Sequence, residues 1–350
     1  MAPEADAVGL FLSSEYLRPL EESGCVAPAT GWTRLALPAP CYEKTHSWGE
    51  FVFDHAFARA YEQRGLDYYP KLVCCVPFTP VPGARLLAAD DAGRRALAGC
   101  LLQEVQERGC SSAHVLYLPE SEAQLLASLH WLRREQERFV WRNPGYARFE
   151  DFLGRLNSKR RRNIRRERKA VADSGLVIEW RAGAQLSAEE WRAVFALYAR
   201  TYRLHGQRPY LNLACLRAWA ENFPEQMLFC LAREGGELAA MAFYFRDGDS
   251  LYGRHWGARA DHDGLHFELC CHQGIEYCIA HGLRRFDAGV QGEHKLLRGF
   301  EPELSLSMHW FAHAGFREAI ADYLGRESRA LQREVDQLAE HDGYRRGSAD

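Results

Sequence analysis

The order of predicted elements in the second half of the chain restricts its fold more than any other feature. Ser187 and Glu190 form a capping box, the signature of a helix start. Gly-Gly and Asp-Gly turns separate three alternating segments and predict an antiparallel meander. The predicted elements are a strand at 175–180, a helix from 187, a second helix, strands at 227–233, 238–245 and 250–257, a helix at 265–281 closed by Gly282, a strand at 284–290, a short helix from 293 and a strand at 304–312. This order predicts an α/β unit (an α+β mixed sheet) in which two neighbouring parallel strands open a cleft.

The first half shows a looser version of the same order. Its predicted elements are a helix at 47–65, strands around 71–78 and 84–88, a helix at 91–109, a strand at 113–119, a helix at 120–130 and a strand at 138–142. A chain of 350 residues also suggests two domains. We therefore expect an N-terminal domain at 1–150, a basic helical connector at 151–174, a C-terminal domain at 175–315 and a C-terminal helix and tail at 316–350.

Positive charge is concentrated in residues 155–169. This segment holds nine Lys or Arg residues and one Glu, a net charge of +8, whereas the whole chain carries −3. As a helix it would place Arg160, Arg161, Arg165 and Arg168 on one face. A solvated helix face is one interpretation, and contact with phosphates, as in tRNA, is the other.

The eleven cysteines include two adjacent pairs and no CxxC spacing, which argues against a disulfide framework and against a zinc finger. Most are expected to be buried thiols. The first twenty residues carry acids where a signal peptide needs Lys or Arg, and no apolar run has the length of a membrane span. The expected location is the cytoplasm.

Six strings of residues carry more information than a fold class. They are KTHSWGEFVFDHAFARAYEQ (44–63), YYPKLVCCVPFTPVPGARLL (68–87), FLGRLNSKRRRNIRRER (152–168), LYGRHWG (251–257), LHFELCCHQGIEYCIAHGL (265–283) and QGEHKLLRGFEP (291–302). Together they resemble the FemAB-like (peptidoglycan biosynthesis/recognition) family of predicted N-acyltransferases. The resemblance implies two tandem GNAT-like (acyl-CoA N-acyltransferase) domains, similar to the Fem enzymes that move an amino acid from aminoacyl-tRNA to a peptidoglycan precursor.

In GNAT enzymes an R/Q-x-x-G-x-G/A loop before a helix holds the pyrophosphate of the donor through backbone N–H groups. The corresponding stretch here runs from Arg254 through Gly257 to Arg259, with Arg in place of the final Gly or Ala. The resemblance implies Arg254 as an anion contact. The alternative is a packed strand end with a turn glycine.

A second candidate site lies in the string that begins at Gln291. Glu293 and His294 are candidates for general acid or base, and Lys295 and Arg298 for contacts with an anion. The alternative is that Glu293 and His294 only cap the short helix.

The helix at 265–281 adds weaker candidates. Glu268 and His272 are four residues apart, so we expect a hydrogen-bonded pair at the cleft edge. A metal site is not expected, because a third close ligand is missing. His255 is a further weak candidate for proton transfer, and Cys271 is expected to be inert on a packed helix.

Polar residues also cluster where the first predicted helix begins. Ser47 is the expected N-cap and Glu50 its capping-box partner. With Trp48 and Lys71 they indicate a pocket for an amine or cationic acceptor.

These observations predict an enzyme that transfers an acyl or aminoacyl group to an amine, with Glu293, His294, His255 and Glu268 as candidate catalytic residues. No tightly bound cofactor is expected; acyl-CoA or aminoacyl-tRNA would be the co-substrate, with Arg161 and Arg165 of the basic segment contacting tRNA. The alternative is a non-catalytic protein of the same fold that binds RNA or a cell-wall precursor. No oligomeric state is predicted.

Overall fold

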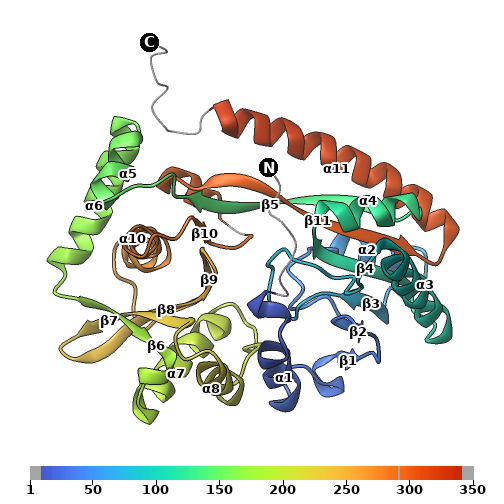
Figure 1. The fold of residues 1–350 in the computed structure, drawn as a ribbon, viewed down its shortest axis with the longest axis horizontal. Coiled ribbons are helices and arrows are strands. Elements are labelled where there is room, and N and C mark those ends of the chain that lie inside the picture. The colour runs from blue at the N-terminus through green and yellow to red at the C-terminus, as the bar shows by residue number, and fades with distance from the viewer. Residues whose placement is uncertain (1–8, 291, 341–350) are drawn as a thin grey trace. The chain divides into compact units, whose positions relative to one another are not determined.

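The computed structural model describes residues 9–290 and 292–340, which fold into two compact units (Figure 1). Unit 1 comprises Met1–Glu137 and Leu304–Asp336, and unit 2 comprises Arg138–Glu303 and Gln337–Asp350. This division differs from the boundaries expected from the sequence. Strand β11 (Glu301–Phe311) pairs with a strand of unit 1 from Leu306 onward, and Leu304–Asp336 belong with the N-terminal half.

Unit 1 has the strand order β1-β2-β3-β4-β11. Its strands are β1 (Trp32–Arg34), β2 (Cys41–Lys44), β3 (Lys71–Cys74) and β4 (Ser112–Leu118), and its helices are α1 (Ser14–Glu22), α2 (His55–Glu62), α3 (Asp91–Glu107), α4 (Glu120–Ser128) and α11 (Ala314–Glu340). β3 and β4 are parallel, whereas β1 and β2, β2 and β3, and β4 and β11 pair antiparallel.

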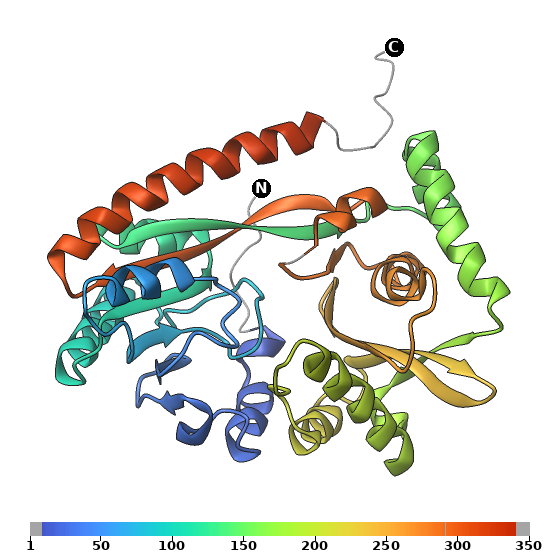
Figure 2. The same cartoon turned by 180° about the vertical axis from the view of Figure 1, so that it is seen from behind.

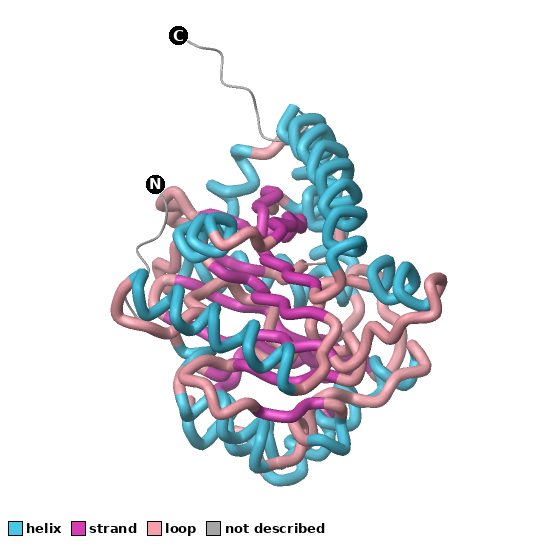
Figure 3. Tube along the Cα trace, turned by 90° about the vertical axis from the view of Figure 1, so that its right-hand side faces the viewer, coloured by secondary structure: helices cyan, strands magenta, loops and turns pink. Residues whose placement is uncertain are grey.

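The two faces of these strands differ. Leu72, Val115 and Met308 belong to the apolar core that side chains of α3 and α4 complete. On the other face, Phe57 of α2 contacts the rings of Phe311 and Tyr323. Helices therefore cover both faces of the strands (Figure 3).

Unit 2 has the strand order β5-β10-β9-β8-β7-β6. Its strands are β5 (Leu132–Arg142), which begins in unit 1, β6 (Val177–Ala182), β7 (Met227–Glu234), β8 (Glu237–Asp247), β9 (Ser250–Ala258) and β10 (Arg285–Asp287). Its helices are α5 (Phe149–Arg155), α6 (Ser158–Asp173), α7 (Ala188–Leu204), α8 (Leu213–Asn222), α9 (Leu265–Phe267) and α10 (Gln273–Ala280). The predicted meander and the capping box of Ser187 are confirmed.

The strands β9 and β10 are parallel but share only a short pairing. Arg285–Asp287 pair with 250–252, whereas β9 continues to Ala258. Beyond Tyr252 the two strands are not paired in register, which leaves an opening at the ends of the strands. Helix α7 packs against β9, and α10 packs against β9 and β10 (Figure 2). The predicted fold class, an α/β chain with mixed sheets, is confirmed.

Two elements of unit 1 differ from prediction. The helix expected at 47–65 begins only at His55, because the preceding residues form an irregular loop. The strand expected at 84–88 is absent, because the backbone N–H of Arg85 donates to the carboxylate of Glu122 rather than to a neighbouring strand.

No helix within the described part of the chain is long and apolar enough to cross a membrane. All eleven cysteines are free and nine are buried, as expected.

Candidate functional site

A cavity of about 330 Å³ lies in unit 2 where β9 and β10 diverge. A π-helical turn, Glu268–His272, joins α9 to α10 beside it, and the 3₁₀ helix Glu293–Arg298 follows β10. The lining residues are Ala242, Phe243, Tyr244, Gly253, Arg254, His255, Trp256, His266, Cys270, Cys271, Ala288, Gly292, His294 and Lys295. Sequence-predicted candidates from two separate segments, Arg254 and His255 on one and His294 and Lys295 on the other, thus meet at one cavity.

The cavity is cationic. Arg254 projects from β9, and Nζ of Lys295 donates to the carbonyl oxygen of Ala288 at 2.5 Å. Burial lowers the pKa of Lys295 to about 8. Among the residues whose side chains the structure describes, none that lines the cavity is an acid. Such a cavity favours a ligand with negative or developing negative charge.

Three imidazoles line the same cavity. Burial lowers the pKa of His255 to about 3 and that of His266 to about 4, and it also lowers the pKa of His294. The rings are therefore neutral at pH 7. The buried Nε2 atoms of His255 and His294 have no hydrogen-bond partner. A neutral imidazole with a free nitrogen can exchange a proton or a hydrogen bond with a ligand.

The two cavity cysteines come from the π-helical turn. Burial raises the pKa of Cys271 to about 11 and that of Cys270 well above its ordinary value. Both thiols are therefore protonated at neutral pH, whereas a nucleophilic cysteine reacts as the thiolate.

Glu268 and Arg298 lie outside the cavity lining. Glu268 accepts from Gln273 and lies 3.3 Å from Nε of Arg168. The predicted hydrogen bond between Glu268 and His272 is wrong: His272 instead bonds Glu167 at 3.0 Å. Arg298 donates to that same Glu167 at 3.1 Å. The side chain of Glu293 lies outside the described residues.

The stretch compared with the pyrophosphate loop is strand rather than loop up to Ala258. Gly257 is needed there, because a Cβ atom would lie 2.4 Å from the carbonyl oxygen of Leu197 in α7. Arg259 pairs with Glu234 and Glu237. The structure therefore agrees with the alternative interpretation of this stretch, a packed strand end.

The basic segment forms the helix α6, held by the buried side chains of Ile164 and Val171. Arg161 donates to the carbonyl of Leu156, and Arg165 pairs with Glu150 at 2.6 Å. Further ion pairs join Arg168 to Glu276 and Lys169 to Asp173, while Lys159, Arg162 and Arg166 are exposed.

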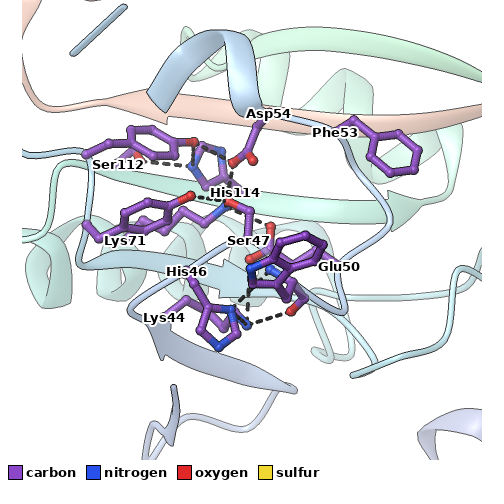
Figure 4. A network of polar contacts seen from close by, with 12 residues as sticks. Lys44, His46, Ser47, Glu50, Phe53, Asp54, Lys71, Ser112 and His114 are labelled. Carbon is purple, nitrogen blue, oxygen red and sulfur yellow. Dashed lines mark hydrogen bonds and ion pairs between the residues drawn. The ribbon is translucent and has the colours of Figure 1, made fainter. Parts of the chain in front are cut away.

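A second group of polar residues gathers in unit 1, on the loop 45–54 and the strands beneath it (Figure 4). Nζ of Lys71 donates to Oγ of Ser47 at 2.9 Å, to Oε2 of Glu50 at 2.7 Å and to Oδ2 of Asp54. Cross-strand pairing puts Lys44 directly opposite Lys71. We call Lys44, Ser47, Glu50, Asp54 and Lys71 the lysine–carboxylate cluster.

The predicted N-cap role of Ser47 is wrong, because α2 begins eight residues later. Its hydroxyl instead bonds the hydroxyl of Tyr69 at 2.8 Å as well as Lys71. Trp48 is half exposed, and its carbonyl accepts from Lys44 at 2.9 Å.

A chain of hydrogen bonds ends on Asp54. Tyr68 donates its hydroxyl to Oδ2 at 2.7 Å, and Nε2 of His114 lies 3.1 Å from the Tyr68 oxygen. The Nδ1 atoms of His114 and His309 are 2.7 Å apart, and Nε2 of His309 bonds Ser307. Tyr68 donates its only proton to Asp54, so its oxygen must accept from Nε2 of His114. We therefore assign each donor in this series of hydrogen bonds as pointing toward the carboxylate of Asp54.

Burial raises the pKa of Glu50 to about 7 and lowers that of Lys44 to about 7. Burial would also raise the pKa of Asp54, but Lys71 holds it well below its usual range. Burial lowers the pKa of His114 well below its usual value and that of His309 to about 3. Asp54 and Lys71 therefore stay ionised, and the histidines stay neutral.

The sequence analysis included Ser47, Trp48, Glu50 and Lys71 in this site but missed Asp54, Tyr68 and the two histidines. A signal was present, because Ser112, His114, Ser307 and His309 stand at alternate positions of two strands and so share a face.

Each unit thus builds its sheet around one parallel pair of neighbouring strands, β3–β4 or β9–β10, and together they define a tandem GNAT-like fold. Residues 4–346 match the FemAB-like family, described as peptidoglycan biosynthesis/recognition, and the chain belongs to that family.

Similar solved structures include FemX, with 10% sequence identity and a TM-score of 0.53 over 91% of this chain and 96% of FemX. They also include L-PGS from Bacillus licheniformis, with 10% identity and a TM-score of 0.51 over 88% and 95% of the two chains. A tandem GNAT protein from the clavulanic acid biosynthesis pathway matches with 13% identity and a TM-score of 0.41, over 87% and 98%. A comparison with curated protein sequences gives no match.

Proposed function

We propose that the chain is an N-acyltransferase that moves an acyl or aminoacyl group to an amine. The observation that carries this proposal is the cavity of unit 2, in which two cations and three neutral imidazoles meet at diverging parallel strands. Acyl transfer to an amine needs donors for a developing oxyanion and a group that moves a proton. Membership of the FemAB-like family supports the same reaction class.

In this proposal Arg254 and Lys295 contact the donor, and His294 and His255 move protons through their unpaired Nε2 atoms. Glu293 remains a candidate acid or base on the sequence argument. Glu268 and Arg298 act indirectly, because each holds α6 against the segments that line the cavity.

The donor is acyl-CoA or aminoacyl-tRNA. Helix α6 supports the second, since the half-buried Arg161 and the exposed Arg165 stand on it with the exposed cations Arg162 and Arg166, which can contact phosphates. FemX and L-PGS have the same fold, but at 10% identity they do not choose between the donors. The family description supports a peptidoglycan precursor as the acceptor.

We assign binding of the acceptor to Ser47, Trp48, Glu50 and Lys71 of unit 1. The carboxylate of Glu50 and the half-exposed ring of Trp48 are groups that attract an ammonium ion.

Mass spectrometry tests the reaction. The purified chain is incubated with a panel of amines and with either charged tRNA or a set of acyl-CoAs. We expect one donor class to yield an acylated amine, with His294→Ala slowing the reaction about 100-fold or more. Absence of product in both arms would favour a non-catalytic binding protein and overturn the proposal.

A further inference from the structure

The lysines of the lysine–carboxylate cluster have no hydrogen-bonding capacity left. An ammonium group has three N–H donors. Those of Lys71 reach Ser47, Glu50 and Asp54. Nζ of Lys44 bonds the carbonyl of Trp48 and the ring of His46 and lies 3.4 Å from the Trp32 ring centroid.

The carboxylates of the same cluster are not saturated. Oε1 of Glu50 and Oδ1 of Asp54 are buried and accept no hydrogen bond; Oε1 lies 4.0 Å from Nζ of Lys44, which is beyond hydrogen-bond distance. A buried acceptor without a donor costs about 1–3 kcal/mol. When Glu50 is ionised, above its pKa of about 7, the unmet capacity is for donors alone, which excludes an anion as the preferred ligand.

The loop above these oxygens is held in an unfavourable backbone conformation. Phe51 has φ +58°, a value that non-glycine residues rarely adopt. Its carbonyl accepts from the hydroxyl of Tyr117, and the carbonyl of Gly49 accepts from the N–H of Phe78, which is itself at φ +56°. Such conformations persist where surrounding contacts impose them, and they cluster at binding sites.

The exposed side of the loop carries Trp48, which is 50% exposed. Its indole ring offers a face to a cation. Phe53, also on this loop, lies apart from the hydrogen-bonded group (Figure 4).

We propose that the loop 45–54 of unit 1 is a binding site for a primary ammonium group, which donates to Oε1 of Glu50 and Oδ1 of Asp54 and reaches them past the ring of Trp48. The inference rests on the proposed function and deepens it, since it names an ammonium group that holds the acceptor here, distinct from the neutral amine that attacks the acyl carbon. Lys71 is a positioning residue here: it fixes both carboxylates through their other oxygens. The hydrogen bonds ending on Asp54 keep that group an anion.

Ligand-observed NMR titration of the full chain tests this site. The probes are n-butylammonium chloride, sodium butyrate and 1-butanol, which share a chain length and differ in charge. We expect the ammonium to bind at least about tenfold more tightly than the other two, and Glu50→Gln to weaken its binding at least about tenfold. Trp48→Ala should weaken it several-fold, whereas Leu66→Ala, which removes another exposed side chain of unit 1, should not change it.

Equal binding of the three probes, or ammonium binding unchanged in both the Glu50→Gln and Trp48→Ala variants, would overturn the inference. Circular dichroism checks the fold of the Glu50→Gln protein, and Trp48→Ala keeps the test decisive if that protein does not fold. A chain that binds butylammonium through Glu50 but acylates no amine retains this site and loses the proposed function. A chain that acylates an amine but shows no Glu50-dependent binding of butylammonium retains the proposed function and loses this site.

Discussion

The cavity of unit 2 and the lysine–carboxylate cluster of unit 1 differ in how their charges are balanced. The cavity of unit 2 collects Arg254 and Lys295, and no acid is among the lining residues whose side chains are described. The lysine–carboxylate cluster of unit 1 sets two lysines against two carboxylates, all of them buried. The described lining of the cavity is therefore positively charged, whereas the cluster balances most of its charge internally. The comparison separates a site that favours an anion from a site where only hydrogen-bond acceptors remain available.

This difference predicts that the two lysines are unequal in their contribution to stability. Lys71→Met leaves the buried carboxylates without their shared cation and should lower the free energy of unfolding by about 3–5 kcal/mol. Lys295→Met removes a cation that faces carbonyl groups beside an open cavity, and should cost about 1 kcal/mol or less. Urea unfolding followed by circular dichroism measures both. Equal losses of unfolding free energy in the two variants would show that Lys71 is coupled to its neighbours no more strongly than Lys295 is.

Acidification should destabilise unit 1 through its neutral histidines. Burial lowers the pKa of His309 to about 3, so the unfolded chain takes up the proton first. This stability is fully present above pH 6.5 and is lost as the pH falls toward 3, with a loss of about 3 kcal/mol expected by pH 4. His309→Gln should flatten the dependence of the urea midpoint on pH. His255 has a similarly lowered pKa but is only half buried, so His255→Gln should flatten it less. An unchanged profile in the His309→Gln protein would contradict the assignment.

The smallest effect on stability is expected on α6. Arg162→Glu with Arg166→Glu reverses two exposed charges and should change the free energy of unfolding by less than about 0.5 kcal/mol. If α6 contacts tRNA, the same change should weaken tRNA binding at least about tenfold and reduce its dependence on salt. A filter-binding titration at several salt concentrations measures this. Unchanged binding would remove α6 from the donor site and favour acyl-CoA.

The sequence predicted the fold of unit 2 better than that of unit 1, and the reason is local. The meander from β7 to β9 is joined by tight turns, and the Ser187 capping box starts α7 from two residues three positions apart. In unit 1 the polar residues within strands weaken the alternation that marks a half-buried strand. The aromatic spacing around Phe57 also extended the predicted helix back over a loop.

The candidate sites depend on contacts between residues far apart in the chain. Arg254, His255 and His294 were each visible as chemistry-bearing residues, but only the divergence of β9 and β10 shows that they share a cavity. The pairing of His114 with His309 joins residues 195 positions apart. No local pattern shows that β11 returns to β4, so this part of the network could not be predicted from the sequence.

The most direct test of the account is the kinetics of amine acylation with the double variant His255→Ala and His294→Ala. Once a donor is identified, steady-state rates are measured by mass spectrometry for the wild type, this variant and Leu66→Ala. The account predicts a fall in kcat/KM of about 100-fold or more for the double variant, with Leu66→Ala unchanged. Wild-type kinetics in the double variant would contradict the claim that acyl transfer takes place in the cavity of unit 2.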